Sequence, residues 1–300
     1  MLLLITGSVD GTSDLLVKEL GNKIFRFNYD LAREYALEFY PDYWKITNPA
    51  GHSIDSKQVT SAFWWKAFNF YIADQENYIV EEIKYIYREI YHWCRIRGLA
   101  KGSAHDFHNH MGKMNILSVA SKYFKTPKTL ITFRLEGVKN FTDKPVVAKS
   151  FASGLTTTNK VLMTTAVNKE SLHPDYPWFL QELVSAKADV TIFVCGKKQF
   201  AYTRDRSRLK GLDWRAEQSF DDLLKKEWFR FELSSEVAIA TSDFCNELGV
   251  DWGRLDLMDD GLEMTFLEFN ANGQWVFLDY SGDDGLVKSV VNYLMPEVLN

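Results

Sequence analysis

The segment Phe266 to Trp275, FLEFNANGQW, places acidic and amide side chains inside an apolar run that is typical of a β-strand. Residues two apart on a strand point to the same face, so Glu268 and Asn270 aim a carboxylate and an amide oxygen at one point. Burying such a pair without a partner costs several kcal/mol. The pair therefore either faces water or meets a ligand that takes oxygen donors.

A second polar pair, Arg254 and Asp256, shares one face of the preceding strand, GRLDLMD. If the two strands pair through the turn at 259–261, Asp256 joins Glu268 and Asn270 in a set of oxygen donors. Hard oxygen ligands without Cys or His suit Mg²⁺. The alternative is a solvated hairpin, because both faces of the second strand carry apolar residues and the pattern alone does not choose between the faces.

Lys149 ends the β-branched run PVVAKSF, where its ammonium is well placed as a point charge for phosphate oxygens. The next segment, SFASGLTTTN, is rich in small residues, so its backbone N–H groups could lie over phosphates. It matches neither a Walker A motif nor a Rossmann fingerprint. A solvated strand end followed by a plain hairpin turn is the alternative.

Gln181 and Glu182 lie inside the apolar run PWFLQELV, and such a strand-to-linker segment can meet an adenine edge through its backbone. An edge strand with a polar face would look the same. The run 204–215 is locally basic through Arg204, Arg206, Arg208 and Arg215, which suits an anionic intermediate but is also typical of a solvated loop. The segment HDFHNH at 105–110 has no spacing typical of a metal site.

The elements that must position these residues begin with a β-α-β pattern: strands at 1–6 and 23–28 around a helix at 12–20 capped by Thr12 or Ser13. An aromatic-rich stretch at 42–72 and a helix at 76–97 follow, and 98–112 reads as a linker. The second half is a series of β-segments interrupted by helices. We expect these helices at about 113–123, 235–248 and 285–298.

Composition limits the function classes. The chain has 300 residues, is 46% hydrophobic and carries a net charge of −5, which argues against a nucleic-acid-binding surface spread over the protein. Its three cysteines suggest neither a disulfide framework nor a zinc site and favour a reducing compartment. The start MLLLITGSVDG reads as a strand, and no apolar run approaches a membrane span. We expect a cytoplasmic protein without a membrane partner.

Taken together, the ordered motifs resemble the ATP-grasp superfamily, specifically the RimK-type ligases and the maturases of microviridins and other graspetides. The resemblance covers roughly residues 109–280, and its most specific part is R-x-D followed by a strand with L-E-x-N-x-x-G-Q-W. It implies an α/β (α+β) ATP-grasp fold behind an N-terminal pre-ATP-grasp α/β domain. The implied regions are a peptide-binding domain at 1–108, a central subdomain at 109–186, and a C-terminal subdomain with the Mg²⁺ site at 187–300.

The resemblance also implies roles for individual residues, with ATP and Mg²⁺ as cofactors. Lys113 and Lys149 would contact the ATP phosphates, and Asp189 would lie near the ribose. The other implied sets are Gln181, Glu182, Leu183 and Val184 around the adenine, Asp256, Glu268 and Asn270 on Mg²⁺, and Arg215 and Arg254 at the transferred phosphate.

Two positions depart from the pattern of these enzymes. Thr191 stands where RimK-type enzymes usually carry an arginine, which puts a ribose or phosphate contact there in doubt. In FWWKAF, at 63–68, Lys66 stands where related maturases tend to have an arginine. Lys66 either replaces that arginine or belongs to a domain that binds a different peptide.

The implied reaction is the ATP-dependent phosphorylation of an Asp or Glu side chain of a ribosomal precursor peptide, followed by closure of a macrocyclic ester or amide. The implied partner is a precursor peptide with a leader segment, for which the aromatic-rich N-terminal region offers apolar surface. A RimK-like ligase that adds an amino acid or amine to a carboxylate is the alternative, and an inactive nucleotide-binding module is a third. The sequence leaves ring size, bond type and a homodimeric state open.

Overall fold

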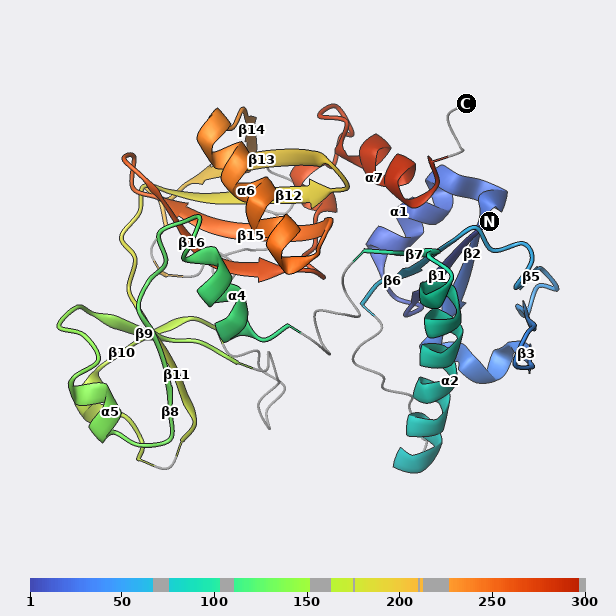
Figure 1. Cartoon of the computed structure of the whole chain (residues 1–300), viewed down its shortest axis with the longest axis horizontal. Coiled ribbons are helices and arrows are strands. Elements are labelled where there is room, and N and C mark those ends of the chain that lie inside the picture. Colours follow the sequence, from blue (N-terminus) through green and yellow to red (C-terminus); the bar gives the residue numbers. More distant parts are fainter. Residues whose placement is uncertain are drawn as a thin grey trace.

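The computed structural model describes residues 1–66, 76–102, 111–151, 163–174, 176–209, 211–212 and 227–296. Its elements form three groups along the chain (Figure 1). Arg215, the histidines of HDFHNH and residues 152–159 of the segment SFASGLTTTN, all singled out above, lie outside the described residues.

The N-terminal lobe is built on a parallel sheet with the strand order β2-β1-β6-β7. Its strands are β1 (Leu2–Thr6), β2 (Ile24–Asn28), β6 (Ser61–Trp64) and β7 (Ala100–Lys101). Its α-helices are α1 (Gly11–Leu20) and α2 (Asn77–Ile96), and short 3₁₀ turns lie at Gly21–Lys23 and Tyr29–Glu34. A small antiparallel sheet is formed by β3 (Ala36–Phe39), β4 (Trp44–Thr47) and β5 (Ser53–Asp55).

The helix cap of α1 differs from the one that we expected. Asp10 caps α1, because its side chain accepts hydrogen bonds from the Ser13 backbone N–H and hydroxyl, each at 2.7 Å. The prediction of Thr12 or Ser13 as N-cap was therefore wrong. Aspartate is an equally strong cap, and α1 begins at Gly11, one residue before the expected start.

The central region is an antiparallel sheet with the order β10-β9-β11-β8. It consists of β8 (Thr129–Thr132), α5 (Glu136–Lys139), β9 (Val146–Ala148), β10 (Thr165–Val167), a 3₁₀ turn at Lys169–Ser171 and β11 (Trp178–Glu182). One face packs on a small core of Val138, Leu172 and Leu180. The opposite face carries Lys149 and Gln181.

The C-terminal sheet is fully antiparallel, with the order β14-β13-β12-β15-β16. Its strands are β12 (Ala188–Cys195), β13 (Lys198–Asp205), β14 (Phe229–Phe231), β15 (Trp252–Asp259) and β16 (Met264–Asn270). The helices around it are α4 (Lys113–Ala120), α6 (Ser235–Leu248) and α7 (Leu286–Leu294), and a 3₁₀ turn lies at Val276–Asp279.

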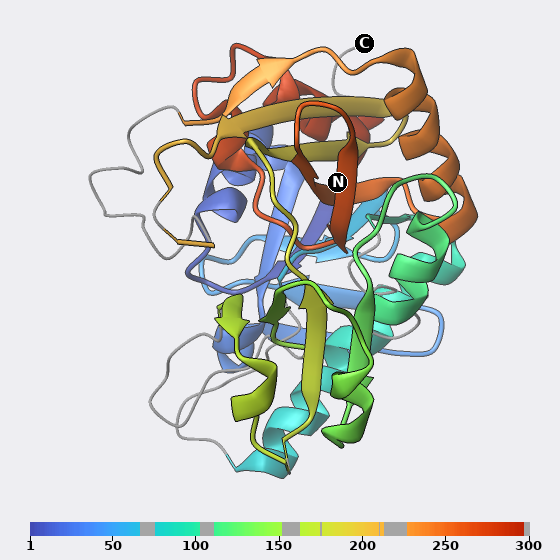
Figure 2. The same cartoon turned by 90° about the vertical axis from the view of Figure 1, so that its left-hand side faces the viewer.

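The two faces of this sheet pack into two different cores. One face, which includes Ile192 and Leu255, packs under α4 and α6. On the other face, Phe193 and Trp252 share a continuous core with Trp65 of the N-terminal lobe and with α7. Figure 2 shows the N-terminal lobe, in blue and cyan, behind the C-terminal sheet and the central region. The shared core fixes the N-terminal lobe against the C-terminal sheet.

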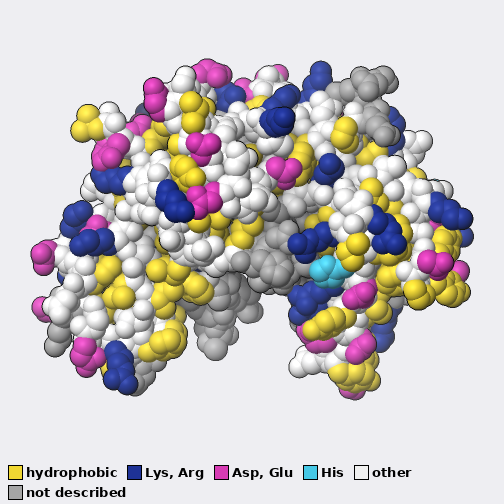
Figure 3. Space-filling model, viewed as in Figure 1, with side chains coloured by type: hydrophobic (Ala, Val, Ile, Leu, Met, Phe, Trp, Pro, Cys, Tyr) yellow, Lys and Arg dark blue, Asp and Glu magenta, His cyan; other side chains and the backbone are white. Residues whose placement is uncertain are grey.

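On the face seen in Figure 3, acidic and basic side chains are interspersed rather than gathered by sign. Among the described residues, no helix combines the length and the hydropathy that a membrane crossing requires.

Candidate active site

The polar residues of β15 and β16 share one face of the C-terminal sheet. The strands pair antiparallel, with Arg254 opposite Asn270 and Asp256 opposite Glu268. Directly opposite residues have Cβ atoms about 4.5–5.5 Å apart. The pairing that we expected from the turn at 259–261 is therefore present, and it places two carboxylates and an amide on adjacent strands, beside a guanidinium.

A β-bulge explains why the sequence pattern of β16 was ambiguous. The register shifts between Asp256 and Leu257, so that Leu257 pairs with Phe266 and Leu267 is the extra residue. Phe266 and Phe269, three apart in sequence, both belong to the core under the helices. The extra residue lets Glu268 face the polar side while both phenylalanines face the helices.

Asp256 is the most constrained member of this set. The guanidinium of Arg254 contacts both of its carboxylate oxygens: Nε lies 2.9 Å from Oδ1, and Nη2 donates to Oδ2 at 3.0 Å. Thr191 donates to Oδ1 at 3.0 Å. Burial raises the pKa of Asp256 and the facing carboxylate of Glu268 raises it further, while Arg254 and Thr191 oppose the shift. A second cation at this position would therefore stabilise the charged form.

Arg254 is itself held by the loop that follows β16. Its Nη1 donates to the carbonyl of Gln274 at 2.8 Å. A Cβ on Gly273 would lie 3.1 Å from the Arg254 Cβ and 3.2 Å from its Nε. The glycine of the NGQW motif therefore lets the loop close tightly over the arginine.

Thr191, one of the two departures from the enzyme pattern, lies directly opposite Asp256 on β12 and is 1% exposed. Its hydroxyl is within hydrogen-bond distance of Leu255 O as well as Asp256. The side chain therefore supports the Asp256 carboxylate.

Asp189, the residue implied to lie near a ribose, precedes Thr191 by two positions and shares its face. Arg206 Nη1 donates to its Oδ1 at 2.5 Å. Burial raises the pKa of Asp189, and the charge of Arg206 counteracts the rise. Its Oδ2 is buried and meets no hydrogen-bond donor among the described residues.

The central sheet carries the second group of candidate residues. The Lys149 ammonium donates to Gln181 Oε1 at 3.4 Å. Lys113, at the start of α4, donates to the carbonyl of Ser150 at 3.0 Å and lies 6.0 Å from the ring centroid of Phe179. The two lysines implied to bind phosphate thus lie on the same side of the central sheet, although they come from different elements.

The segment 181–184 connects the two sheets, and much of its hydrogen-bonding capacity is already used. The backbone N–H groups of Glu182 and Leu183 donate to Lys128 O at 3.0 Å and Pro145 O at 2.8 Å. The Glu182 carboxylate accepts from Thr142 and Lys144. In the part of the chain that the structure describes, Val184 N–H makes no protein hydrogen bond and is the candidate donor to an adenine edge.

The donor set on β15 and β16 fits Mg²⁺. Two carboxylates and one amide supply hard oxygen atoms and leave positions for water or phosphate, which Mg²⁺ commonly keeps. The negative charge of Glu268 raises the pKa of Asp256, and a cation bound between the two carboxylates would offset this repulsion. Among the described residues, no group of three His, Cys, Asp or Glu side chains is placed to hold a metal, so a site on these strands would have to include Asn270 as its third ligand.

No protein-family model and no curated protein matches the sequence. Solved structures match it over nearly its whole length. The RiPP-associated ATP-grasp ligase of Chryseobacterium gregarium, in complex with ADP and a leader and core peptide, has a TM-score of 0.83 and 21% identity over 98% of this chain and 96% of that one.

The macrocyclase MdnC of Microcystis aeruginosa MRC, bound to the precursor peptide MdnA, has a TM-score of 0.79 and 18% identity over 98% and 99% of the two chains. The ATP-grasp ligase PsnB, with a minimal precursor, Mg and ADP, has a TM-score of 0.72 and 15% identity over 98% and 97%. The chain therefore has the ATP-grasp fold that its motifs predicted, with an additional N-terminal α/β lobe.

Proposed function

We propose that this protein is an ATP-dependent ligase that phosphorylates an Asp or Glu side chain of a ribosomal precursor peptide and closes a macrocyclic ester or amide. The observation that carries the proposal is the pairing of Arg254-x-Asp256 with Glu268-x-Asn270 on one sheet face, in a chain with the ATP-grasp fold. An inactive nucleotide-binding module would not need both carboxylates opposite each other, where they repel.

The protein's own groups would act mainly by neutralising and positioning charge. Lys113 and Lys149 would bind the phosphate oxygens of ATP, and Arg254 would steady the phosphoryl group during transfer. Bound Mg²⁺, held by Asp256, Glu268 and Asn270, would supply Lewis-acid neutralisation of the phosphates.

The chemistry needs no enzyme nucleophile. An oxygen of the acceptor carboxylate attacks the γ-phosphorus, the bond to the β-phosphate oxygen breaks, and ADP leaves. A hydroxyl or amine of the same peptide then attacks the acyl carbon, loses its proton, and displaces phosphate. The ring closes with the net loss of one water from the peptide.

The peptide acceptor is supported by the solved structures. The Chryseobacterium gregarium ligase holds a leader and core peptide, and MdnC holds its precursor. We propose a leader-bearing peptide as the partner here too, with residues 1–108 as its binding domain, 109–186 as the central subdomain and 187–300 as the C-terminal subdomain. Use of ATP and three buried free thiols favours the cytoplasm as the compartment.

The test is mass spectrometry of a candidate precursor peptide, with Thr or Ser and Asp or Glu clusters behind a leader, incubated with the enzyme and MgATP. Loss of one water mass per ring, dependent on the leader, supports the macrocyclase. A mass gain equal to an added amino acid or amine would replace it with the RimK-like alternative.

Glu268→Gln and Asn270→Ala should abolish ATP turnover with the fold intact, because each removes a ligand of the proposed metal. Glu263→Gln is the matched control, since Glu263 is half exposed and pairs with Lys125 at the other end of β16. ATP turnover at the wild-type rate in either of these two variants would contradict the assignment of the residue as a metal ligand.

A further inference from the structure

The N-terminal sheet has a topological switch point beside β1. The connection through α1 leads from β1 to β2 on one side, whereas β6 pairs with β1 on the other side. In open α/β sheets, ligands bind beyond the carboxyl ends of the strands where the strand order reverses. In this lobe that place is formed by residues 7–10 after β1 and residues 65–66 after β6, which we call the switch-point edge.

The switch-point edge and the first turn of α1 that follows it are bound to the loop that carries the NANGQW motif. Thr12 donates to Gln274 Oε1 at 2.7 Å, and the Lys66 backbone N–H donates to Asn272 Oδ1 at 3.5 Å. Trp65 packs against Trp252, the residue two positions before Arg254. A ligand at this edge would therefore lie next to the proposed phosphoryl-transfer residues.

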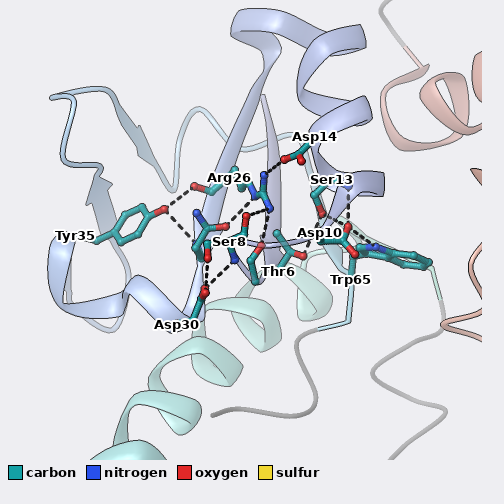
Figure 4. Close-up of polar contacts among 11 residues, drawn as sticks. Thr6, Ser8, Asp10, Ser13, Asp14, Arg26, Asp30, Tyr35 and Trp65 are labelled. Carbon is teal, nitrogen blue, oxygen red and sulfur yellow. Dashed lines mark hydrogen bonds and ion pairs between the residues drawn. The ribbon is translucent and has the colours of Figure 1, made fainter. Parts of the chain in front are cut away.

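Asp10 and Trp65 give this edge a defined shape. Asp10 Oδ1 accepts from the Ser13 backbone, the Ser13 hydroxyl and, at 3.0 Å, Trp65 Nε1 (Figure 4). The Trp65 backbone N–H donates to Ile5 O at 2.9 Å. Both segments of the edge are thus tied to each other, and Lys66 follows directly from the fixed tryptophan.

Lys66 has an unusual backbone. With φ of 54°, it is the one non-glycine residue with positive φ in the described ranges. This region is unfavourable for a residue with a Cβ and is retained where the surroundings require it. A glycine would fit without strain, so the lysine side chain is present in spite of the backbone.

The charges around Lys66 indicate what its side chain meets. Burial lowers the pKa of Lys66, Asp10 opposes the change, and the nearby guanidinium of Arg254 adds to it. Lys66 and Arg254 are therefore two cations within electrostatic range across the contact between the lobes. An anion placed between them would relieve their repulsion.

We propose that Lys66 binds the side-chain carboxylate of the acceptor and holds it beside Arg254 for attack on the γ-phosphorus. The proposal rests on the proposed function and adds the residue that selects the acceptor. The carboxylate is favoured over an ATP phosphate because Lys66 belongs to the N-terminal lobe, whereas the proposed nucleotide residues belong to the central region: Lys149 directly follows β9, and Gln181 lies on β11.

The test measures binding of a small probe to the full-length enzyme loaded with MgADP. The probe is N-acetyl-L-glutamate α-amide, and its uncharged counterpart is N-acetyl-L-glutamine α-amide. We expect the wild type to prefer the acid. Lys66→Met should weaken binding of the acid by about tenfold or more, as expected for one charge-assisted hydrogen bond, while Lys66→Arg retains it. Affinity for ADP should not change.

Lys57→Met is the control, because Lys57 is an exposed lysine of the same lobe. Lys66→Gly removes the charge without backbone strain and replaces the methionine variant if that variant misfolds. A wild type that does not distinguish acid from amide, or a Lys66→Met that binds the acid as tightly as the wild type, overturns the proposal. Weaker ADP binding by Lys66→Gly would assign Lys66 to the nucleotide and also overturn it. Failure of the wild type to bind ADP would instead contradict the proposed function.

Discussion

Replacing Thr191 by valine tests whether β12 orients the central carboxylate of the site. The substitution keeps the shape and β-branching of a side chain that is 1% exposed, and it removes only the hydroxyl that donates to Asp256 Oδ1 at 3.0 Å. Asp256 keeps its contacts with Arg254 but loses a donor that holds it from the opposite side.

The magnitude follows from two opposing effects. Loss of a hydrogen bond to a charged group costs about 1.5–3 kcal/mol. Burial of a methyl group in place of the hydroxyl returns about 0.8 kcal/mol. We expect a net loss of about 1–2 kcal/mol, which corresponds to a fall in Tm of roughly 2–6 °C for a chain of this size. Loss of a group that supports a metal ligand should also lower the affinity for Mg²⁺, so that the Mg²⁺ concentration needed for half-maximal ATP turnover rises by about 10–100-fold.

Two assays separate these effects: thermal unfolding without ligands, and Mg²⁺ titration of ATP turnover. Thr265→Val is the control, because Thr265 is buried on β16 and its hydroxyl makes no hydrogen bond within the described ranges. Thr191→Ser should restore most of the Mg²⁺ affinity. If Thr191→Val melts and titrates like the wild type, the hydroxyl does not orient Asp256 and the reasoning is refuted.

Three further predictions follow from other parts of the molecule. Lys149→Ala should raise KM for ATP and lower kcat, with kcat/KM reduced about tenfold or more, because the lost charge faces phosphate in both ground and transition states. Unchanged kinetics would show that Lys149 does not contact the phosphates. Lys66→Gly should raise stability by about 1 kcal/mol in thermal unfolding, because it relieves a positive φ of 54°, and a lower Tm would contradict this. Burial raises the pKa of Cys94 and Cys245 to about 12 and also raises that of Cys195. The thiolate fraction at pH 8 is then small, so all three thiols should resist a thiol-specific reagent until the protein unfolds; rapid labelling of the native protein would show that the burial is wrong.

The sequence predicted the site best where local periodicity decides the geometry. The two-residue strand period places Arg254 with Asp256 and Glu268 with Asn270. The two pairs reach the same face of the sheet only because of the bulge, since without it Asp256 would lie opposite Leu267. The bulge at Leu267 was not predictable, because an extra residue in a strand depends on how both faces are packed. The three-stranded sheet β3-β4-β5 was also missed, since its strands are short and their aromatic residues fit a helix or a strand equally well.

The rest depends on contacts between distant segments. Asp10 caps α1 and also holds the indole of Trp65, which is 55 residues away. Thr191 was noticed as a departure, but its partner Asp256 is 65 residues further along the chain. The αL conformation of Lys66 has no local sequence signal, because lysine is not a residue that favours it.

The unequal cores of the three regions have a consequence for folding cooperativity. In the described part of the chain, the separate core of the central sheet has only three buried side chains, those of Val138, Leu172 and Leu180, whereas the core between the other two regions is large and continuous. Segments with few buried apolar contacts open at a lower free energy than the rest of a protein, and their amide hydrogens exchange first.

A ligand that binds only the closed, folded form of the central sheet stabilises it by about 2.7 kcal/mol when it is present at a hundred times its Kd. Binding of the nucleotide would then supply much of the stabilisation of β9 and β11 that their small core does not provide. Occupancy of the site and local folding of this sheet become one linked equilibrium, so amide protection in β8, β9 and β11 should rise with nucleotide concentration while β12 and β15 change little.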